Sequence, residues 1–189
     1  MRRAEAIELL AATKGDGLSV TTMRAIPDWY ATGAAPAMHL DNRGCMGGAA
    51  PMALGLALAQ PNRRVMVIDG DGSLLMQLGV LATIAEAACP NFYHVVMVNG
   101  VYETSGLQPT PAADKLDFAA MALGAGYRKA YSIDDLGVLR ERLPAIMAEE
   151  GPVMLALKVQ PETARDEVPS TRPKDQAKYL RDMLMGAGK

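Results

Sequence analysis

The sequence has few cysteines, no strong excess of either charge and no long apolar run. Its 189 residues contain only two cysteines, Cys45 and Cys89, which are too few for a disulfide framework and too far apart for a zinc knuckle. Reduced thiols are therefore expected, and with them a cytoplasmic location.

The charges are balanced. Nineteen Lys and Arg residues against 21 Asp and Glu give a formal net charge of -2, so no basic face for nucleic acid and no polybasic arm for a membrane surface is expected. No run of 18 apolar residues occurs, and Glu5 and Glu8 interrupt the first segment, so neither a membrane span nor a secretion signal is expected. Any bound anion must be held by local chemistry.

Apolar strands alternate with helices along most of the chain. Predicted strands are residues 18–22, 65–69, 93–98, 127–131 and 153–159. Predicted helices are residues 3–12, 49–59, 73–88 with a bend near Gly79, 115–123 and 133–149, with a further helix around Trp29. This order predicts an α/β fold: a doubly wound, mostly parallel sheet with helices on both faces and right-handed crossovers.

Two segments fall outside the alternation. Residues 39–48 are glycine-rich without a clear period and are predicted to be a loop. Residues 161–189 are polar and contain three prolines from Pro161 to Pro173, which predicts a C-terminal arm and a terminal helix that packs on a partner. Residues 1–189 are expected to form a single domain.

Oxygen-bearing side chains follow two neighbouring strands. Asp71 lies in Gly70-Asp71-Gly72-Ser73 after one strand, and Asn99 ends the next. Ligands of α/β sheets bind at such carboxyl ends. Glycines let the backbone approach an anion, helix N–H groups suit phosphate, and Asp71 and Asn99 offer hard oxygens to a divalent cation. The pair predicts a magnesium site that bridges a diphosphate; the alternative is an ordinary Asp-Gly turn.

These residues resemble the fingerprint of thiamin diphosphate-dependent enzymes, in which Gly-Asp-Gly is followed about 25 residues later by Asn-Asn. Here 25 residues separate Ser73 from Asn99, and Val98 replaces the first asparagine. Gly44-Cys45-Met46-Gly47 is similar to the family segment that holds the aminopyrimidine. The resemblance covers residues 18–159 and implies the thiamin diphosphate-binding fold, with thiamin diphosphate and Mg²⁺ as cofactors.

The resemblance also implies roles for single residues. Asp71, Asn99 and the Val101 carbonyl are expected to bind Mg²⁺, with Gly72 and Ser73 at the diphosphate. Gly70 is expected to be a cofactor-binding residue. The Gly44 carbonyl is expected to accept from the exocyclic amine, and Met46 to wedge the cofactor into its bent shape unless it only fills the core. Cys45 belongs to the same cofactor-binding segment, its side chain being interpreted as a packing residue. The remaining cofactor-binding candidate is Tyr102.

Only half of a thiamin enzyme is covered. The resemblance implies that a pyrimidine-domain alpha subunit supplies the activating glutamate, in a hetero-oligomer of alpha2beta2 or larger composition. Gly106-Leu107-Gln108-Pro109-Thr110 is similar to a motif of phosphonopyruvate decarboxylases, and the layout to the beta chain of sulfopyruvate decarboxylase. A small anionic 2-oxo acid decarboxylated to an aldehyde is implied. The alternatives are an acetolactate-type carboligase subunit and a non-catalytic flavodoxin-like binding or assembly domain.

Because the activating glutamate is expected from the partner, this chain offers only candidates for contact with the substrate. They are His39, Arg43, Tyr102, Glu103 and Gln108. His39 titrates near neutrality, with a structural role as the alternative. Arg43 has the fork that grips an anion, or it pairs with Asp41. The sequence leaves open whether Arg24 and Arg172 reach the site.

Overall fold

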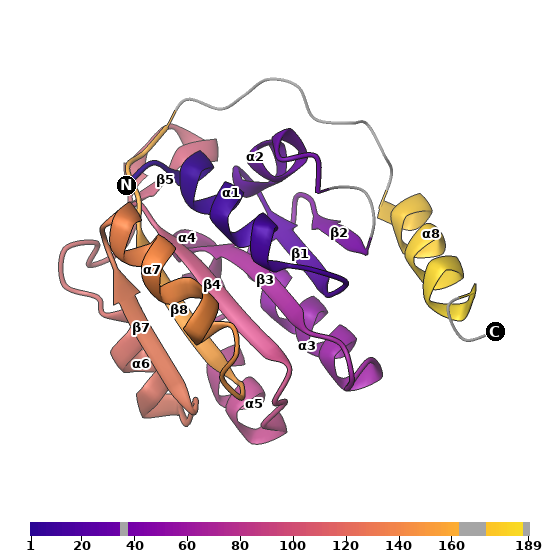
Figure 1. Ribbon diagram of the computed structural model, residues 1–189. Helices are drawn as coiled ribbons and strands as arrows, with labels where there is room; N and C mark the ends of the chain where they lie inside the picture. Colours follow the sequence, from indigo (N-terminus) through magenta and orange to yellow (C-terminus); the bar gives the residue numbers. More distant parts are fainter. Residues whose placement is uncertain (35–37, 163–172, 187–189) are drawn as a thin grey trace.

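A computed structural model describes residues 1–34, 38–162 and 173–186 (Figure 1). Six strands form one parallel sheet in the order β2-β1-β3-β4-β8-β7. They are β1 (Leu18–Thr22), β2 (His39–Asn42), β3 (Val65–Gly70), β4 (Phe92–Val98), β7 (Lys129–Ile133) and β8 (Val153–Lys158). A small antiparallel hairpin of β5 (Val101–Tyr102) and β6 (Gln108–Pro109) stands apart from this sheet.

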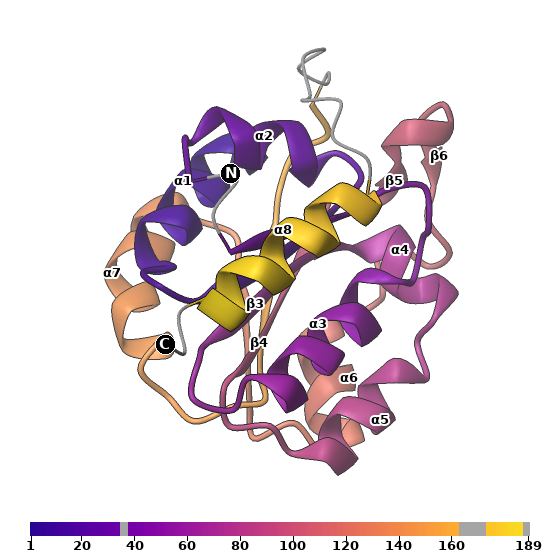
Figure 2. The ribbon, with the colours of Figure 1, turned by 90° about the vertical axis from the view of Figure 1, so that its right-hand side faces the viewer.

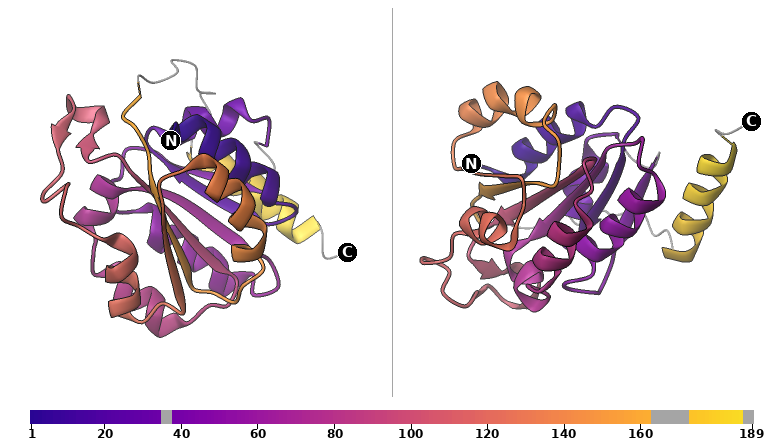
Figure 3. Two further views of the ribbon diagram at one scale, coloured as in Figure 1. Left: turned by 60° about the vertical axis from the view of Figure 1, so that its left-hand side comes forward. Right: turned by 90° about the horizontal axis from the view of Figure 1, so that it is seen from below.

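Helices cover both faces of the sheet (Figures 2 and 3). One face carries α1 (Arg3–Thr13), α2 (Ala25–Ala31) and α7 (Leu136–Ile146). The other carries α3 (Ala49–Ala59), α4 (Asp71–Met76), α5 (Val80–Ala87) and α6 (Phe118–Ala125). Helix α8 (Pro173–Gly186) lies beside the edge strand β2. The predicted doubly wound α/β fold is confirmed.

The central strands are buried on both sides because their side chains alternate between two apolar clusters. Met66 and Ile68 of β3 pack under α1, α2 and α7, whereas Val65 and Val67 pack on the opposite face with α3. All four are fully buried. This explains the uninterrupted apolar run of the sequence, as expected for a parallel strand covered by two helical layers.

Several predicted boundaries were wrong, among them those of β7, expected at 127–131, and of α7, expected at 133–149. Residues 39–42, expected to belong to a loop, form β2, whose polar residues His39, Asp41 and Asn42 are nevertheless buried. The helix expected at 73–88 is divided into α4 and α5, so the break near Gly79 is complete. Helix α6 begins later than expected, because the Asp117 side chain caps it by accepting from Ala120 N at 3.0 Å.

Helix α8 lies in the C-terminal segment, where a helix is predicted, whereas the predicted arm at 163–172, including Arg172, lies outside the described residues. Within the ranges that the structure describes, no helix combines the length and hydropathy needed to cross a membrane.

Asn91 joins the turn after α3 to the start of β4. Its side-chain Nδ2 donates to the carbonyls of Ala57, Gln60 and Arg63 at 3.2, 3.0 and 2.8 Å. Asn91→Ala leaves these carbonyls without their donor, so we expect the free energy of unfolding to fall by about 1–3 kcal/mol in chemical denaturation. Asn62→Ala, an exposed asparagine in the same turn, is the matched control and should change it by less than about 0.5 kcal/mol. Equal effects of the two substitutions on the free energy of unfolding would contradict the stabilising role of the Asn91 hydrogen bonds.

Candidate functional site

A pocket open to solvent lies at the carboxyl ends of β1, β3 and β4. The chain moves outward from β1 to β2, then returns to the other side of β1 with β3, so the strand order reverses between β1 and β3. Ligands of open α/β sheets bind at such a reversal. Residues from all three strand ends meet there, among them Thr22, Gly70 and Asn99.

Asp71 occupies the first position of α4, directly after β3, and only 3% of it is exposed. Its Oδ1 accepts from Gly72 N at 2.7 Å, and its Oδ2 accepts from the backbone N–H groups of Asn99 and Gly100 at 3.1 and 2.7 Å. Burial raises the pKa of the Asp71 carboxyl, although these three hydrogen bonds act against the shift. The carboxylate thus fixes the end of β3 against the turn after β4.

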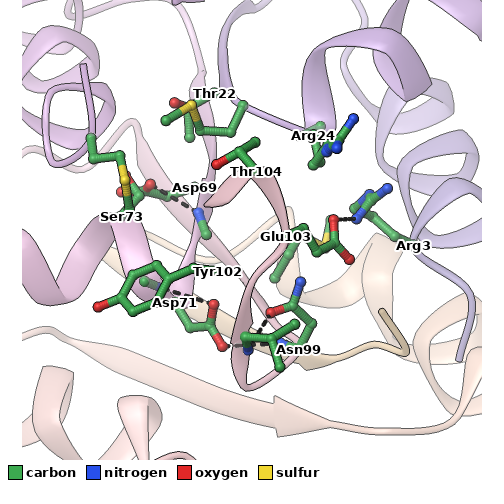
Figure 4. A pocket seen from close by; sticks show the side chains of 17 residues that line it. Arg3, Thr22, Arg24, Asp69, Asp71, Ser73, Asn99, Tyr102, Glu103 and Thr104 are labelled. Atoms are coloured by element: carbon green, nitrogen blue, oxygen red, sulfur yellow. Dashed lines mark hydrogen bonds and ion pairs between the residues drawn. The ribbon is translucent and has the colours of Figure 1, made fainter. Parts of the chain in front are cut away.

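Asn99 lies beside Asp71, as the sequence predicts (Figure 4). Val101 lines the same pocket. The Asn99 Oδ1 accepts from Val101 N at 2.9 Å, which tightens the turn into the β5–β6 hairpin. Asp71 uses three of the roughly four lone-pair positions of a carboxylate, and Asn99 Oδ1 uses one of its two. Each side chain retains a position for a further donor or cation.

The predicted pyrimidine segment is tied to the predicted diphosphate segment. Gly47 N donates to Ser73 Oγ at 3.0 Å, and a side chain at Gly47 would collide with Gln77, its Cβ lying 2.8 Å from that of Gln77. Met46 is half-buried and lines the pocket. Gly44 is exposed, with a φ of 70°. Cys45 is also exposed, so the expectation that its side chain packs is wrong.

The Tyr102 ring packs directly against the backbone of Gly72. A Cβ at residue 72 would overlap this ring and would approach Thr110 Cγ2 to 3.3 Å. Both Gly72 and Tyr102 line the pocket. The second glycine of the Gly-Asp-Gly motif is therefore required by the approach of an aromatic ring from the β5–β6 hairpin.

We expect Gly72→Ala to lower the free energy of unfolding by about 1–3 kcal/mol, because the new methyl group must displace the ring. Gly70→Ala is the matched control, since no atom of the described part of the chain lies within 4 Å of its added Cβ. In the double variant Gly72→Ala/Tyr102→Ala the collision is absent, so the two losses should be less than additive in a double-mutant cycle. Strict additivity would contradict this contact.

Glu103, a candidate for substrate contact, is committed to a buried ion pair. Arg3 donates from Nη1 to Glu103 Oε2 at 2.6 Å and from Nε to Asp28 Oδ2 at 2.7 Å. Glu103 Oε1 also accepts from Glu162 N at 2.9 Å. The carboxylate therefore fastens the pocket wall to α1, to α2 through Arg3, and to the segment after β8.

Three other candidates are not among the residues that line the pocket. His39 is buried in β2, where Nδ1 lies 2.9 Å from Ser19 Oγ and Nε2 lies 2.9 Å from Asp41 Oδ1. Burial lowers its pKa despite the nearby carboxylate. Arg43 donates to Asp41 Oδ2 at 3.1 and 2.8 Å, in agreement with the alternative interpretation of that residue. Gln108 is exposed in β6.

Asp41 is the centre of a buried polar cluster outside the pocket, and it anchors α8. Gln176 of α8 donates to Asp41 Oδ2 at 2.8 Å and accepts from Asp41 N at 3.1 Å. Although burial acts to raise its pKa, hydrogen bonds from His39, Gln176 and Arg43 lower the pKa of Asp41 to about 2. Stability that depends on this ionised carboxylate is present above its unfolded pKa of 3.8 and is lost as the pH falls through about 2.

Gln176→Ala removes one donor to this carboxylate and should cost about 1.5–3 kcal/mol of unfolding free energy at neutral pH. The difference from the unaltered chain should shrink as the pH falls from about 4 to about 2, because Asp41 then becomes protonated. Denaturant titrations across this range measure it. Lys178→Ala, an exposed position of α8, should show no such pH-dependent difference. If the difference in unfolding free energy between Gln176→Ala and the unaltered chain did not change with pH, the role of the Asp41 charge would be contradicted.

Two pocket residues were not assigned from the sequence. Arg24 follows β1 after Met23, which has a φ of 50°, and its buried Nε has no hydrogen-bond partner among the residues that the structure describes. Asp69 is buried at the end of β3 and accepts from Gly70 N at 2.9 Å. Its Oδ2 lies 3.7 Å from Nε2 of His94. Apart from its position at a predicted strand end, neither residue carries a sequence signal.

The donor set fits a divalent cation with a diphosphate. Asp71 and Asn99 offer oxygens of the kind that Mg²⁺ binds in small numbers, leaving other positions to water and phosphate. Among the described residues, no group of three or more His, Cys, Asp or Glu could hold a metal, so a site built entirely from such ligands is not found there. The Asp71 carboxylate, the Asn99 amide and the adjacent backbone supply only some of the ligands of a cation, which suits a cation bound together with a phosphate anion.

Comparisons with known proteins agree with this geometry. The chain belongs to the family described as "Thiamine pyrophosphate enzyme, C-terminal TPP binding domain", which matches residues 22–157. This assignment favours thiamin chemistry over the flavodoxin-like interpretation. The benzoylformate decarboxylase structure from Polynucleobacter necessarius, at 19% identity, has the same fold with a TM-score of 0.72, over 86% of this chain and 34% of that chain.

Two relatives of known name match different shares of their own length. Phosphonopyruvate decarboxylase from Streptomyces hygroscopicus is 39% identical over 76% of this chain, and the match spans 36% of that relative's length. Sulfopyruvate decarboxylase subunit beta from Methanothermobacter thermautotrophicus is 37% identical over 87% of this chain and 85% of its own length. This chain thus corresponds to about a third of one relative and to most of the other.

Proposed function

We propose that this chain is the beta subunit of a split decarboxylase that uses thiamin diphosphate and Mg²⁺ to convert a small anionic 2-oxo acid, of the sulfopyruvate or phosphonopyruvate type, to an aldehyde without oxidation. The observation that carries the proposal is the position of Asp71 and Asn99, which face one pocket from the ends of adjacent strands β3 and β4. Family membership and the 37–39% identical decarboxylases support it.

The residues of this chain would bind and orient rather than transfer protons. Asp71, Asn99 and the Val101 carbonyl would hold Mg²⁺, and Gly72 and Ser73 would lie at the diphosphate. Bound thiamin diphosphate supplies an electron sink for the electrons left when carbon dioxide departs. Met46, which lines the pocket, would support the bent cofactor, and Gly44 would accept from its exocyclic amine.

The ion pair between Arg3 and Glu103 keeps the wall of the pocket in place. Because Arg3 and the backbone N–H of Glu162 both donate to the nearly buried Glu103 carboxylate, its oxygens are already engaged within this chain. We propose that the acid that activates the cofactor comes from a pyrimidine-domain alpha subunit. The subunit-beta name of the Methanothermobacter relative, with its similar length, supports a split enzyme.

Asp71→Ala and Asn99→Ala should each weaken binding of thiamin diphosphate with Mg²⁺ by about 100-fold, because each removes a cation ligand. Titration calorimetry of the chain together with its alpha subunit measures this, and removal of Mg²⁺ with a chelator should have the same effect on the unaltered complex. Asp16→Ala is the matched control, since Asp16 is exposed in the turn before β1, at the amino end of this strand and away from the pocket at its carboxyl end. Full affinity in both site variants would refute the metal assignment.

Activity separates the remaining alternatives. The chain alone should not decarboxylate sulfopyruvate or phosphonopyruvate, whereas the complex with the pyrimidine-domain chain should release carbon dioxide and an aldehyde. Formation of an acetolactate-type product instead would show carboligation. Normal activity of the isolated chain would exclude the split-subunit proposal.

A further inference from the structure

Two arginines line the pocket, and they differ in how their charges are balanced. Arg3 donates from Nε and Nη1 to the carboxylates of Asp28 and Glu103, at 2.7 and 2.6 Å. Arg24 forms neither a hydrogen bond nor an ion pair with any residue that the structure describes, and its Nε is buried. An unpaired buried donor of this kind is costly unless a ligand satisfies it.

The position of Arg24 limits what that ligand can be. Arg24 follows β1, on the β1 side of the reversal in strand order, whereas Asp71 follows β3 on the other side. Figure 4 shows Arg24 and Asp71 on opposite sides of the pocket, with Thr104 and Glu103 between them in this view. A ligand that reaches both must present negative charge to the guanidinium and a cation to the carboxylate.

We propose that Arg24 donates to the oxyanion of a diphosphate whose Mg²⁺ is held by Asp71 and Asn99. This inference rests on the proposed function and adds a residue to its anion site. A magnesium diphosphate retains net negative charge, and the planar guanidinium offers paired donors that match phosphate oxygens. Arg3 cannot take this role while two carboxylates occupy it, so Arg24 supplies the uncommitted arginine charge of the pocket.

The strand end that carries Arg24 is held firmly. Thr22 donates from Oγ1 to the Asn42 carbonyl at 3.0 Å, and Asn42 Nδ2 donates to the Cys45 carbonyl, so the start of the pyrimidine segment and the end of β1 are joined. Arg24 therefore belongs to a wall fixed before any ligand binds. A pre-organised donor loses less conformational freedom on binding than a free surface arginine does.

Binding of inorganic pyrophosphate with Mg²⁺ tests the proposal directly, because this probe needs only the half of the cofactor site that the chain contains. Titration calorimetry on the full chain should show Arg24→Gln weakening pyrophosphate binding by about 10- to 100-fold. Arg24→Lys keeps the charge without the fork and should give a smaller loss. Arg128→Gln, an exposed arginine just before β7 at the opposite edge of the sheet, is the matched control and should bind normally.

Three other outcomes are distinct. If the unaltered chain binds pyrophosphate and Arg24→Gln binds it equally well, the role of Arg24 is refuted while the proposed function stands. If Arg24→Gln leaves pyrophosphate affinity unchanged but raises the KM of the complex for the 2-oxo acid, the guanidinium binds the substrate anion and the diphosphate assignment is wrong. If the unaltered chain fails to bind pyrophosphate both alone and with the alpha subunit, the proposed function itself fails.

Discussion

The Asp71 carboxylate holds the pocket together, because it accepts backbone N–H groups from two separate segments. Gly72 lies in its own helix, whereas Asn99 and Gly100 follow the neighbouring strand β4. One buried side chain therefore sets the separation of the two strand ends and the start of the β5–β6 hairpin. The ring of Tyr102 can then return onto Gly72 and close that side of the pocket.

The two polar clusters of the chain have different tasks, although both contain buried carboxylates. Asp41 is surrounded by donors, including Arg43 and Gln176, and its lowered pKa shows that its charge is well compensated. Asp71 has backbone donors but no ion pair among the described residues, and burial raises its pKa. The carboxylate charge is compensated at Asp41, where α8 docks, but only partly at Asp71 in the pocket. This is expected where a charged ligand is to complete the site.

The fold and the ligand motifs were predictable because they depend on local pattern. Buried strands β3 and β4 are apolar throughout, and Asp71 and Asn99 follow them directly. The sequence could not show β2, since its burial depends on α8, which is distant in the chain. Nor could it decide between the two interpretations of Arg43, which pairs with its near neighbour Asp41, or show that Arg24 has no hydrogen-bond partner for Nε among the described residues.

The incomplete compensation of Asp71 makes folding and occupancy thermodynamically linked. An ionised carboxylate kept from water lowers the stability of the empty chain, and a cation that binds only the folded state recovers it. A ligand at 100 times its dissociation constant adds about 2.7 kcal/mol to the free energy of unfolding. The melting temperature of this chain would then rise with ligand concentration. The fraction of the chain that is folded would therefore depend on how much ligand is present.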